Sequence, residues 1–307
     1  MLIPCTAALL LTATACTGQS PGDRTTAATP ARTPHSGDPV PPAQRPAALP
    51  GRAGQEEDNA QAAVARQASA RDQALAAAGR WGLAARPLTA PPPPATRPEL
   101  VASTNVLLHD GVPPVVYRVP TDWPVVFLTI DDGAAKDPEL VRMLGDLKVP
   151  VSIFLSDYLA RTDYGYFRQL QAQGAGVNNH TINHPDLRRL DAAQQRQEIC
   201  GQRDRLEQEL HTRPALFRPP YGEYTDTTLQ TAAACDVRAI PLWTEEAFPD
   251  RIEWRYDDQR LHPGDIILTH FRDPGTDWQG TMAQMLRRVI DTATAQGFAL
   301  ARLDDYL

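Results

Sequence analysis

From about residue 99 onward, short apolar runs typical of buried strands alternate with amphipathic runs typical of helices. The strand-like runs are residues 125–130, 151–155, 175–178, 215–218, 237–242, 265–269 and 298–303. The helix-like runs are residues 138–147, 164–173, 192–211, 225–235 and 280–296. This alternation, with about seven strands, predicts an α/β domain whose parallel sheet is either open or closed into a barrel. In both arrangements, catalytic groups lie at the C-terminal ends of the strands.

The N-terminal third has a different composition. Residues 1–16 contain a short apolar run followed by small residues and Cys16, as in a signal segment that ends at a lipobox. Two features depart from that pattern, because no Lys or Arg precedes the apolar run and Ala13 stands where a lipobox normally has Leu. Residues 17–98 hold about half of the 29 prolines together with many alanines. We expect this segment to be a largely disordered Pro/Ala-rich linker with a solvated helix at 55–80.

The whole-chain composition limits the possible partners. A net charge of -7 gives no support for binding nucleic acid or an anionic membrane. We therefore expect an exported protein that contacts a membrane only through a lipid anchor at Cys16. The four cysteines form neither a disulfide scaffold nor a zinc-ribbon pattern. Cys200 and Cys235 form either a disulfide or two buried thiols, and the sequence leaves both open.

Two adjacent carboxylates, Asp131 and Asp132, end the first strand-like run, and Gly133 follows them. Neighbouring carboxylates repel each other unless a positive group lies beside them. One interpretation is a simple turn, because Asp and Gly are common turn residues. The other is a polar site at a strand end, and similar polar clusters after later strands favour it.

A pair of histidines, His180 and His184, follows the third strand-like run. Residues four apart share one face of a helical turn, so these two imidazoles can bind one ion. Pro185 disfavours helical backbone at His184, which predicts a turn or loop. Two histidines and one aspartate leave coordination positions open, as in catalytic metal sites. The alternative is a pair of ordinary surface or core histidines.

Two further strand ends carry polar side chains. Arg218 precedes two prolines, which restrict the backbone and hold Arg218 and Tyr221 in defined places. A fixed guanidinium can bind a carboxylate through two hydrogen bonds and keep it ionised, although a purely structural arginine fits equally well. His270 ends another strand-like run, and taken alone it is more simply a capping or core histidine.

In this order, the four motifs resemble those of the polysaccharide deacetylases, carbohydrate esterase family four, also called the NodB homology domain. The motifs are Thr129-Ile-Asp131-Asp132-Gly133, His180-Thr-Ile-Asn-His184-Pro185, Arg218-Pro-Pro-Tyr221-Gly222 and Leu268-Thr-His270. The resemblance covers about residues 124–307 and implies a distorted (β/α) barrel that binds a divalent metal ion, usually Zn²⁺. Family members remove acetyl groups from polymers of N-acetylglucosamine or, in some cases, from acetylated xylan.

The resemblance also implies a metal site and a catalytic base. Asp132, His180 and His184 would bind the metal ion. Asp131 would be the catalytic base, and Arg218 would orient it. The two adjacent aspartates would then have different roles.

The same resemblance makes His270 the general acid and places Tyr221 and Trp243 at the substrate groove, with the backbone N–H of Tyr221 holding the oxyanion. One segment departs from the family pattern. The segment after Val237 in the family normally has an acidic residue and a downstream Asp-Trp pair that support the acid histidine. Here Trp243 fits and Glu246 stands for the usual aspartate, but no Asp-Trp pair follows. What tunes His270 and shapes the sugar site is therefore left open.

The sequence thus predicts a monomeric, metal-dependent hydrolase in residues 99–307. Its predicted reaction is the removal of N-acetyl groups from an extracellular polysaccharide, such as the N-acetylglucosamine residues of peptidoglycan or a chitin-like glycan. One alternative is an O-deacetylase of acetylated xylan, and another is a non-catalytic glycan-binding lipoprotein on the same fold. Non-haem iron oxygenases also use two histidines and one carboxylate, but on all-β folds that this alternation does not predict.

Overall fold

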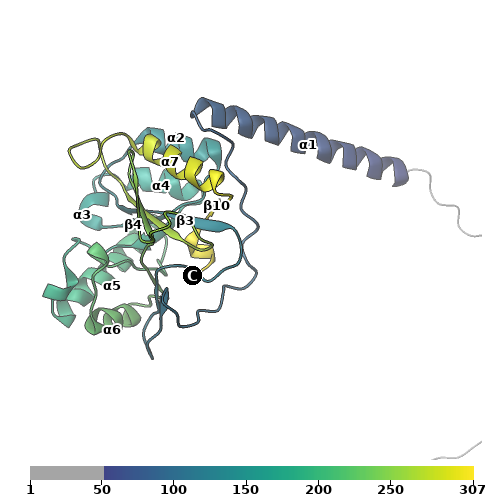
Figure 1. Cartoon of the computed structure of the whole chain (residues 1–307). Coiled ribbons are helices and arrows are strands. Elements are labelled where there is room, and N and C mark those ends of the chain that lie inside the picture. Colours follow the sequence, from purple (N-terminus) through teal and green to yellow (C-terminus); the bar gives the residue numbers. More distant parts are fainter. Residues whose placement is uncertain (1–51) are drawn as a thin grey trace, which may run out of the picture. The chain divides into compact units, whose positions relative to one another are not determined.

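The computed structural model describes residues 52–307, with side chains from residue 55 on (Figure 1). Helix α1 (Arg52–Arg80) coincides with the Ala-rich stretch of the predicted linker. The predicted lipobox and the linker up to residue 51 lie outside the described residues. Among the helices of residues 52–307, none is long and apolar enough to cross a membrane.

A seven-stranded sheet forms the centre of the domain, and β3 (Val125–Asp132) is its central strand. The strand order is β5-β4-β3-β9-β7-β8, and β10 also pairs with β3. Every pairing in this sheet is parallel except that of β7 with β8. The other bounds are β4 (Ser152–Leu155), β5 (Gly176–Asn179), β7 (Glu245–Ala247), β8 (Ile252–Trp254), β9 (Ile266–His270) and β10 (Ala299–Ala301).

Single bridges continue the sheet beyond β5, from Asn179 to Phe217 and from Leu216 to Ala239. They lead to a small second sheet of order β1-β2-β6. Its strands are β1 (Val106–Leu107), β2 (Val115–Val116) and β6 (Ile240–Pro241). The strands therefore curve round as a distorted barrel, which confirms the predicted fold class.

The helices cover the outside of this barrel. Their bounds are α2 (Pro138–Leu147), α3 (Asp157–Ala160), α4 (Tyr164–Ala172), α5 (Ala192–Leu210), α6 (Asp226–Ala234) and α7 (Met282–Ala295). Contacts link α7 to α2, α2 to α4, α4 to α5 and α5 to α6. Figure 1 shows α2, α4 and α7 on one side of the sheet, and α5 and α6 on the other.

Strand β3 is buried along its whole length because both of its faces are covered. Side chains alternate between the two faces of a strand. Val126, Leu128 and Ile130 pack in the core cluster that contains the buried residues of α2, α4 and α7. Phe127 points the other way, into a second cluster with Phe154. By this alternation Asp131, at the end of the strand, belongs to the inner face of the barrel.

Two predicted strands are much shorter than expected. Residues 215–218 make only single bridges, because Pro214 precedes this run and Pro219 follows it, and proline has no N–H to donate to a ladder. Residues 237–242 contribute only β6, which belongs to the small sheet. The antiparallel pair of β7 and β8 was not predicted, because its residues include two adjacent glutamates, which are uncommon in strands.

A disulfide joins Cys200 in α5 to Cys235, which follows α6. This resolves the choice that the sequence left open between a disulfide and two free thiols. The bond fastens together the two helices that pack against each other on that side of the barrel.

Candidate active site

The two aspartates of β3 reach the same site because the backbone turns at Asp132, the last residue of the strand. In a regular strand, adjacent side chains point to opposite faces. Asp132 has a φ of 76°, in the left-handed region, which breaks this alternation. Both carboxylates can therefore face the same end of the barrel, and both are buried, with 2 % and 5 % of their surface exposed. Asp is among the residues that adopt this conformation most readily.

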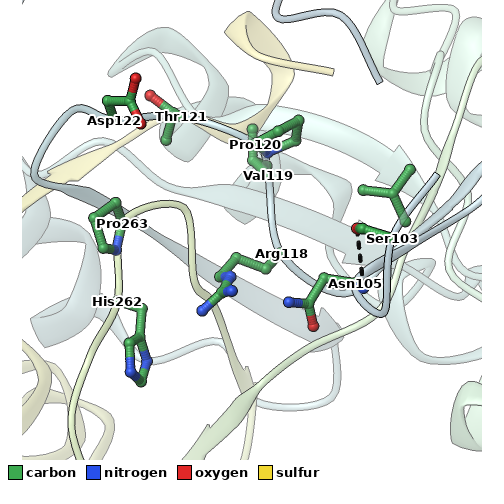
Figure 2. A pocket seen from close by; sticks show the side chains of 10 residues that line it. Ser103, Asn105, Arg118, Val119, Pro120, Thr121, Asp122, His262 and Pro263 are labelled. Atoms are coloured by element: carbon green, nitrogen blue, oxygen red, sulfur yellow. Dashed lines mark hydrogen bonds between the residues drawn. The ribbon is translucent and has the colours of Figure 1, made fainter. Parts of the chain in front are cut away.

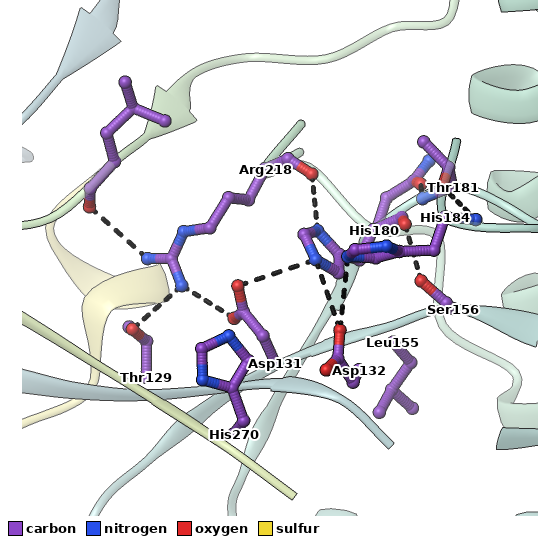
Figure 3. A network of polar contacts seen from close by, with 12 residues as sticks. Thr129, Asp131, Asp132, Leu155, Ser156, His180, Thr181, His184, Arg218 and His270 are labelled. Carbon is purple, nitrogen blue, oxygen red and sulfur yellow. Dashed lines mark hydrogen bonds and ion pairs between the residues drawn. The ribbon is translucent and has the colours of Figure 1, made fainter. Parts of the chain in front are cut away.

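The histidine pair lies on a strained loop after β5. Thr181 and His184 both have positive φ angles, of 69° and 55°. The loop is fixed at both ends, since the Ser156 hydroxyl donates to the carbonyl of His180 at 2.7 Å and the N–H of His184 donates to the Thr181 hydroxyl at 3.0 Å. Backbone strain of this kind concentrates at functional sites. The loop predicted from Pro185 is present, and it turns both imidazoles towards Asp132 (Figure 3).

Three potential ligand atoms converge at this point. Oδ1 of Asp132 lies 3.6 Å from Nε2 of His180 and 3.3 Å from Nε2 of His184. The ligand atoms of the three residues lie within 4.8 Å of one another. Oδ1 of Asp132 is buried and has no hydrogen-bond partner in residues 55–307. A buried carboxylate oxygen without a donor is costly, and a bound cation would satisfy it. The donor set of two imidazoles and one carboxylate fits a divalent ion such as Zn²⁺.

The orientation of His180 also suits a metal ligand. Its Nδ1 lies 2.7 Å from the carbonyl oxygen of Arg218. A carbonyl can only accept, so Nδ1 carries the proton, and the lone pair of Nε2 is directed to the ligand cluster. A hydrogen bond of this kind from the second ring nitrogen is the usual way in which proteins orient a metal-binding histidine.

Arg218 lies beside the base candidate, as predicted. Its Nη1 donates to Oδ1 of Asp131 at 2.7 Å, and both side chains are almost completely buried. The same Nη1 donates to the Thr129 hydroxyl at 3.0 Å, and Nε donates to the carbonyl of Pro241 at 2.9 Å. The guanidinium also stacks 4.3 Å from the centre of the Phe154 ring. These contacts hold the Arg218 side chain in place, and Arg218 in turn orients the Asp131 carboxylate (Figure 3).

Burial is the largest cause of the pKa shifts of Asp131, His180 and His184. It raises the pKa of Asp131 to about 6, although Arg218 and His270 both oppose the rise. It lowers the pKa of His180 to about 4, and it also lowers that of His184, to which the neighbouring His180 contributes. Both histidines are thus neutral near pH 7, which is the form that binds a metal ion.

His270 ends β9 next to Asp131, with which it is paired across the sheet. Burial lowers the pKa of His270, while Asp131 and Asp132 oppose that change. Its Nδ1 lies 3.3 Å from Oε1 of Glu246. Glu246 is therefore the acidic side chain beside His270, and burial raises its pKa to about 7.

The two predicted substrate residues lie at different depths. Tyr221 is 63 % exposed, has a φ of 62°, and packs its ring 4.8 Å from that of His184. Trp243 is half-buried, and its ring lies 5.8 Å from the Arg218 guanidinium. A Cβ on Gly222 would approach the Trp243 ring to 2.9 Å, so a glycine is needed there. Tyr221 therefore lies at the opening of the site, and Trp243 supports the turn beneath it.

Sequence reasoning missed two side chains around the opening. Arg272 follows His270 by two residues, and its guanidinium lies 3.7 Å from Oδ2 of Asp132. Lys136 holds the loop after β3, since its ammonium donates to the carbonyls of Gly133 and Leu159 at 2.8 and 2.7 Å. Both residues lie within three positions of a recognised motif, and only that proximity marked them in the sequence.

A separate cavity of about 600 Å³ lies at the opposite end of the strands (Figure 2). It is lined by Arg118 and His262, which precede β3 and β9 respectively. The candidate metal ligands follow the C-terminal ends of their strands. This cavity therefore contains none of the predicted site residues.

Comparisons with known proteins agree with this geometry. Residues 118–240 match the family model described as polysaccharide deacetylase. An uncharacterized protein of Streptomyces coelicolor is 42% identical over 197 residues, which cover 64% of this chain and 78% of the relative. A chitooligosaccharide deacetylase of a Bradyrhizobium species is 31% identical over 157 residues, or 47% of this chain and 69% of that enzyme. The chain belongs to the polysaccharide deacetylase family.

A solved structure supports the same fold for the family domain. A peptidoglycan N-acetylglucosamine deacetylase matches with a TM-score of 0.56 and 24% identity, covering 63% of this chain and 92% of that one. The α/β barrel of the deacetylase family also excludes the all-β fold of the non-haem iron oxygenases.

Proposed function

We propose that this protein is a metal-dependent deacetylase that removes N-acetyl groups from N-acetylglucosamine residues of peptidoglycan or a chitin-like glycan. The observation that carries this proposal is the juxtaposition of a three-residue ligand cluster with the buried Asp131–Arg218 pair. Relatives named as chitooligosaccharide and peptidoglycan N-acetylglucosamine deacetylases support this choice of substrate.

Asp132, His180 and His184 would hold the divalent ion. When bound, such an ion supplies a Lewis acid for the amide carbonyl and lowers the pKa of water. The chain itself supplies the proton transfers. Asp131, oriented by Arg218, is placed to take a proton from the attacking water.

His270 is placed on the neighbouring strand to protonate the departing amine nitrogen. It would do so while Glu246, 3.3 Å from its Nδ1, stabilises the imidazolium. The backbone N–H of Tyr221 would donate to the oxyanion, and the turn that carries it is fixed by two prolines and the contact of Gly222 with Trp243. Exposed Tyr221 would also contact the sugar ring.

We further propose that the protein acts outside the cytoplasm. The Cys200–Cys235 disulfide supports this, because disulfides persist in oxidising compartments. Lipid attachment at Cys16 remains part of this proposal, and mass spectrometry of the protein from its native membrane would test it.

Acetate release tests the proposed activity. The protein would be assayed side by side on chitooligosaccharide, peptidoglycan and acetylxylan, each with added Zn²⁺ and with a chelator. Zinc-dependent release from the N-acetylated substrates is the expected result. Release from acetylxylan alone would instead identify an O-deacetylase. No release from any substrate, with metal bound and the fold intact, would contradict the enzyme and favour a glycan-binding protein.

A further inference from the structure

Arg272 is held at the opening of the site by the residue before it. Phe271 is completely buried, its N–H donates to the carbonyl of Asp131, and its own carbonyl accepts from Ala135. Both hydrogen bonds are 3.1 Å long. The backbone at Arg272 is thus tied to the loop that follows β3. The side chain extends from this anchor and is 54% exposed.

The guanidinium lies over the candidate site. Nη2 is 3.7 Å from Oδ2 of Asp132, the carboxylate oxygen that is not directed at the two histidines. The N–H of Tyr158 donates to the carbonyl of Ile182 at 2.9 Å, in the loop that carries both histidines, and the ring of Tyr221 lies 4.8 Å from that of His184. Both tyrosines are partly exposed and therefore lie beside the same site as Arg272.

The guanidinium of Arg272 has no close carboxylate partner within the described residues. Within residues 55–307, Asp132 is the only carboxylate within 4 Å of its guanidinium, and at 3.7 Å the contact is longer than a hydrogen bond. An arginine has five donors in a planar fork that matches a carboxylate. A partly exposed, fixed guanidinium next to the reacting groups is thus suited to bind an anion that arrives with the substrate.

We propose that Arg272 is a substrate-recognition residue that binds a carboxylate carried close to the acetamido group. This inference rests on the proposed deacetylase function and narrows its substrate to an anionic glycan. The carboxylate has two possible sources. It can belong to the lactyl ether of an N-acetylmuramic acid next to the acetylated N-acetylglucosamine, as in peptidoglycan, or to a uronic acid on the neighbouring sugar.

Kinetics on three N-acetylated substrates test this inference. The substrates are a neutral chitooligosaccharide, a peptidoglycan-derived oligosaccharide that contains N-acetylmuramic acid, and an oligosaccharide that alternates N-acetylglucosamine with glucuronic acid. Arg272→Gln is expected to raise KM about tenfold for a carboxylate-bearing substrate and less than about twofold for the neutral one. Arg272→Lys should give an intermediate value, because it keeps the charge and loses the planar fork. Added salt should reduce the effect.

Arg213→Gln is the matched control, because Arg213 is 50% exposed and follows α5 at the far end of the barrel. It removes the same charge and should leave all three KM values unchanged. The substrate whose KM responds to Arg272→Gln identifies the source of the carboxylate. Equal loss on all three substrates, or no loss on either anionic one, would overturn the proposal.

A binding measurement separates this inference from the proposed reaction. Calorimetric titration of Asp131→Asn with the same oligosaccharides requires no turnover. Adding Arg272→Gln should raise Kd about tenfold for an anionic oligosaccharide and leave the neutral one unchanged. If the wild-type protein releases no acetate but this difference in Kd appears, the deacetylase function fails and the recognition role stands. If acetate is released but neither Kd nor KM differs, the recognition role fails and the deacetylase function stands.

Discussion

The guanidinium of Arg218 donates to the carboxylate of Asp131 at 2.7 Å inside the barrel, where both side chains are shielded from water. Burial alone would favour a neutral carboxyl, and it raises the pKa of Asp131 to about 6 even with Arg218 beside it. Arg218 therefore limits a rise that would otherwise be larger. Near pH 7 this leaves Asp131 ionised but still basic enough to accept a proton, as a general base requires.

Asp131→Asn is expected to lower kcat by at least about 100-fold, because it removes the proposed base. The ligand cluster does not include Asp131, so bound zinc should remain. Acetate release and elemental analysis of the same sample check both parts. Circular dichroism must show a folded protein, since the change leaves the buried Arg218 without its charged partner. Retained turnover would remove Asp131 from the role of base.

His184→Ala is expected to weaken metal binding by at least about 100-fold, because even residues that only orient a ligand contribute 10–100-fold. Equilibrium dialysis against zinc, followed by elemental analysis, measures this directly. His109→Ala is a suitable control, since His109 is exposed and is not among the clustered ligands. Full zinc occupancy in His184→Ala would contradict the proposed site.

Glu246→Gln is expected to lower kcat about tenfold on the proposed substrate. A carboxylate beside an imidazole favours its protonated form, so its removal should lower the pKa of His270. The alkaline limb of the kcat profile should then move to lower pH, because the proposed acid loses its proton earlier. Glu253→Gln changes the cross-strand partner of Glu246 and should have a much smaller effect. An unchanged profile in Glu246→Gln would show that the 3.3 Å contact does not tune the acid.

The helices were predictable because their apolar periodicity is local. The predicted run 138–147 is observed as α2 (Pro138–Leu147), with Asp137 capping the N–H of Glu139 and Pro138 in the first turn. The buried strands β3 and β9 were predictable for a related reason, since both are nearly continuous apolar runs. β7 and β8 were missed because their pairing depends on tertiary contacts that no local pattern records.

The site was only partly predictable from the sequence. The motifs pointed to Asp132, His180 and His184, and the structure places their ligand atoms together. The sequence suggested the contact of Glu246 with His270 only indirectly, because Glu246 stands for the usual aspartate in the segment that departs from the family pattern. The position of Arg272 was not foreseen, because it depends on the buried anchor Phe271 and on its backbone hydrogen bonds with Asp131 and Ala135. These contacts have no sequence signature of their own.

The disulfide should contribute measurably to stability. Cys200 and Cys235 are separated by 35 positions, and a loop of that size corresponds to about 4 kcal/mol in the chain-entropy view. The double variant Cys200→Ala/Cys235→Ala should therefore lower Tm by about 8–16 °C, as differential scanning calorimetry would show. The wild-type protein with reductant should behave like the variant. An unchanged Tm in both would mean that the link between α5 and α6 adds no stability.

A buried acid pair at the other end of the barrel should make stability depend on pH. Burial and the neighbouring Asp265 hold the pKa of Glu245 well above its usual 4.5, while Thr244 and Arg118 oppose that rise. A raised carboxyl pKa means that the folded state binds more protons than the unfolded state above pH 4.5. The contribution of Glu245 is therefore complete below pH 4.5 and declines as pH rises through the folded-state pKa.

Glu245→Gln keeps the shape of the side chain and removes the titrating proton. It should stabilise the protein relative to wild type by about 1–3 kcal/mol at pH 9, where the wild-type protein must bury a charge, and by much less at pH 5. Urea denaturation at pH 5, 7 and 9 measures this difference. Glu57→Gln is a control, because Glu57 is exposed on α1. A constant difference between Glu245→Gln and wild type at all three pH values would show that Glu245 is not the group responsible.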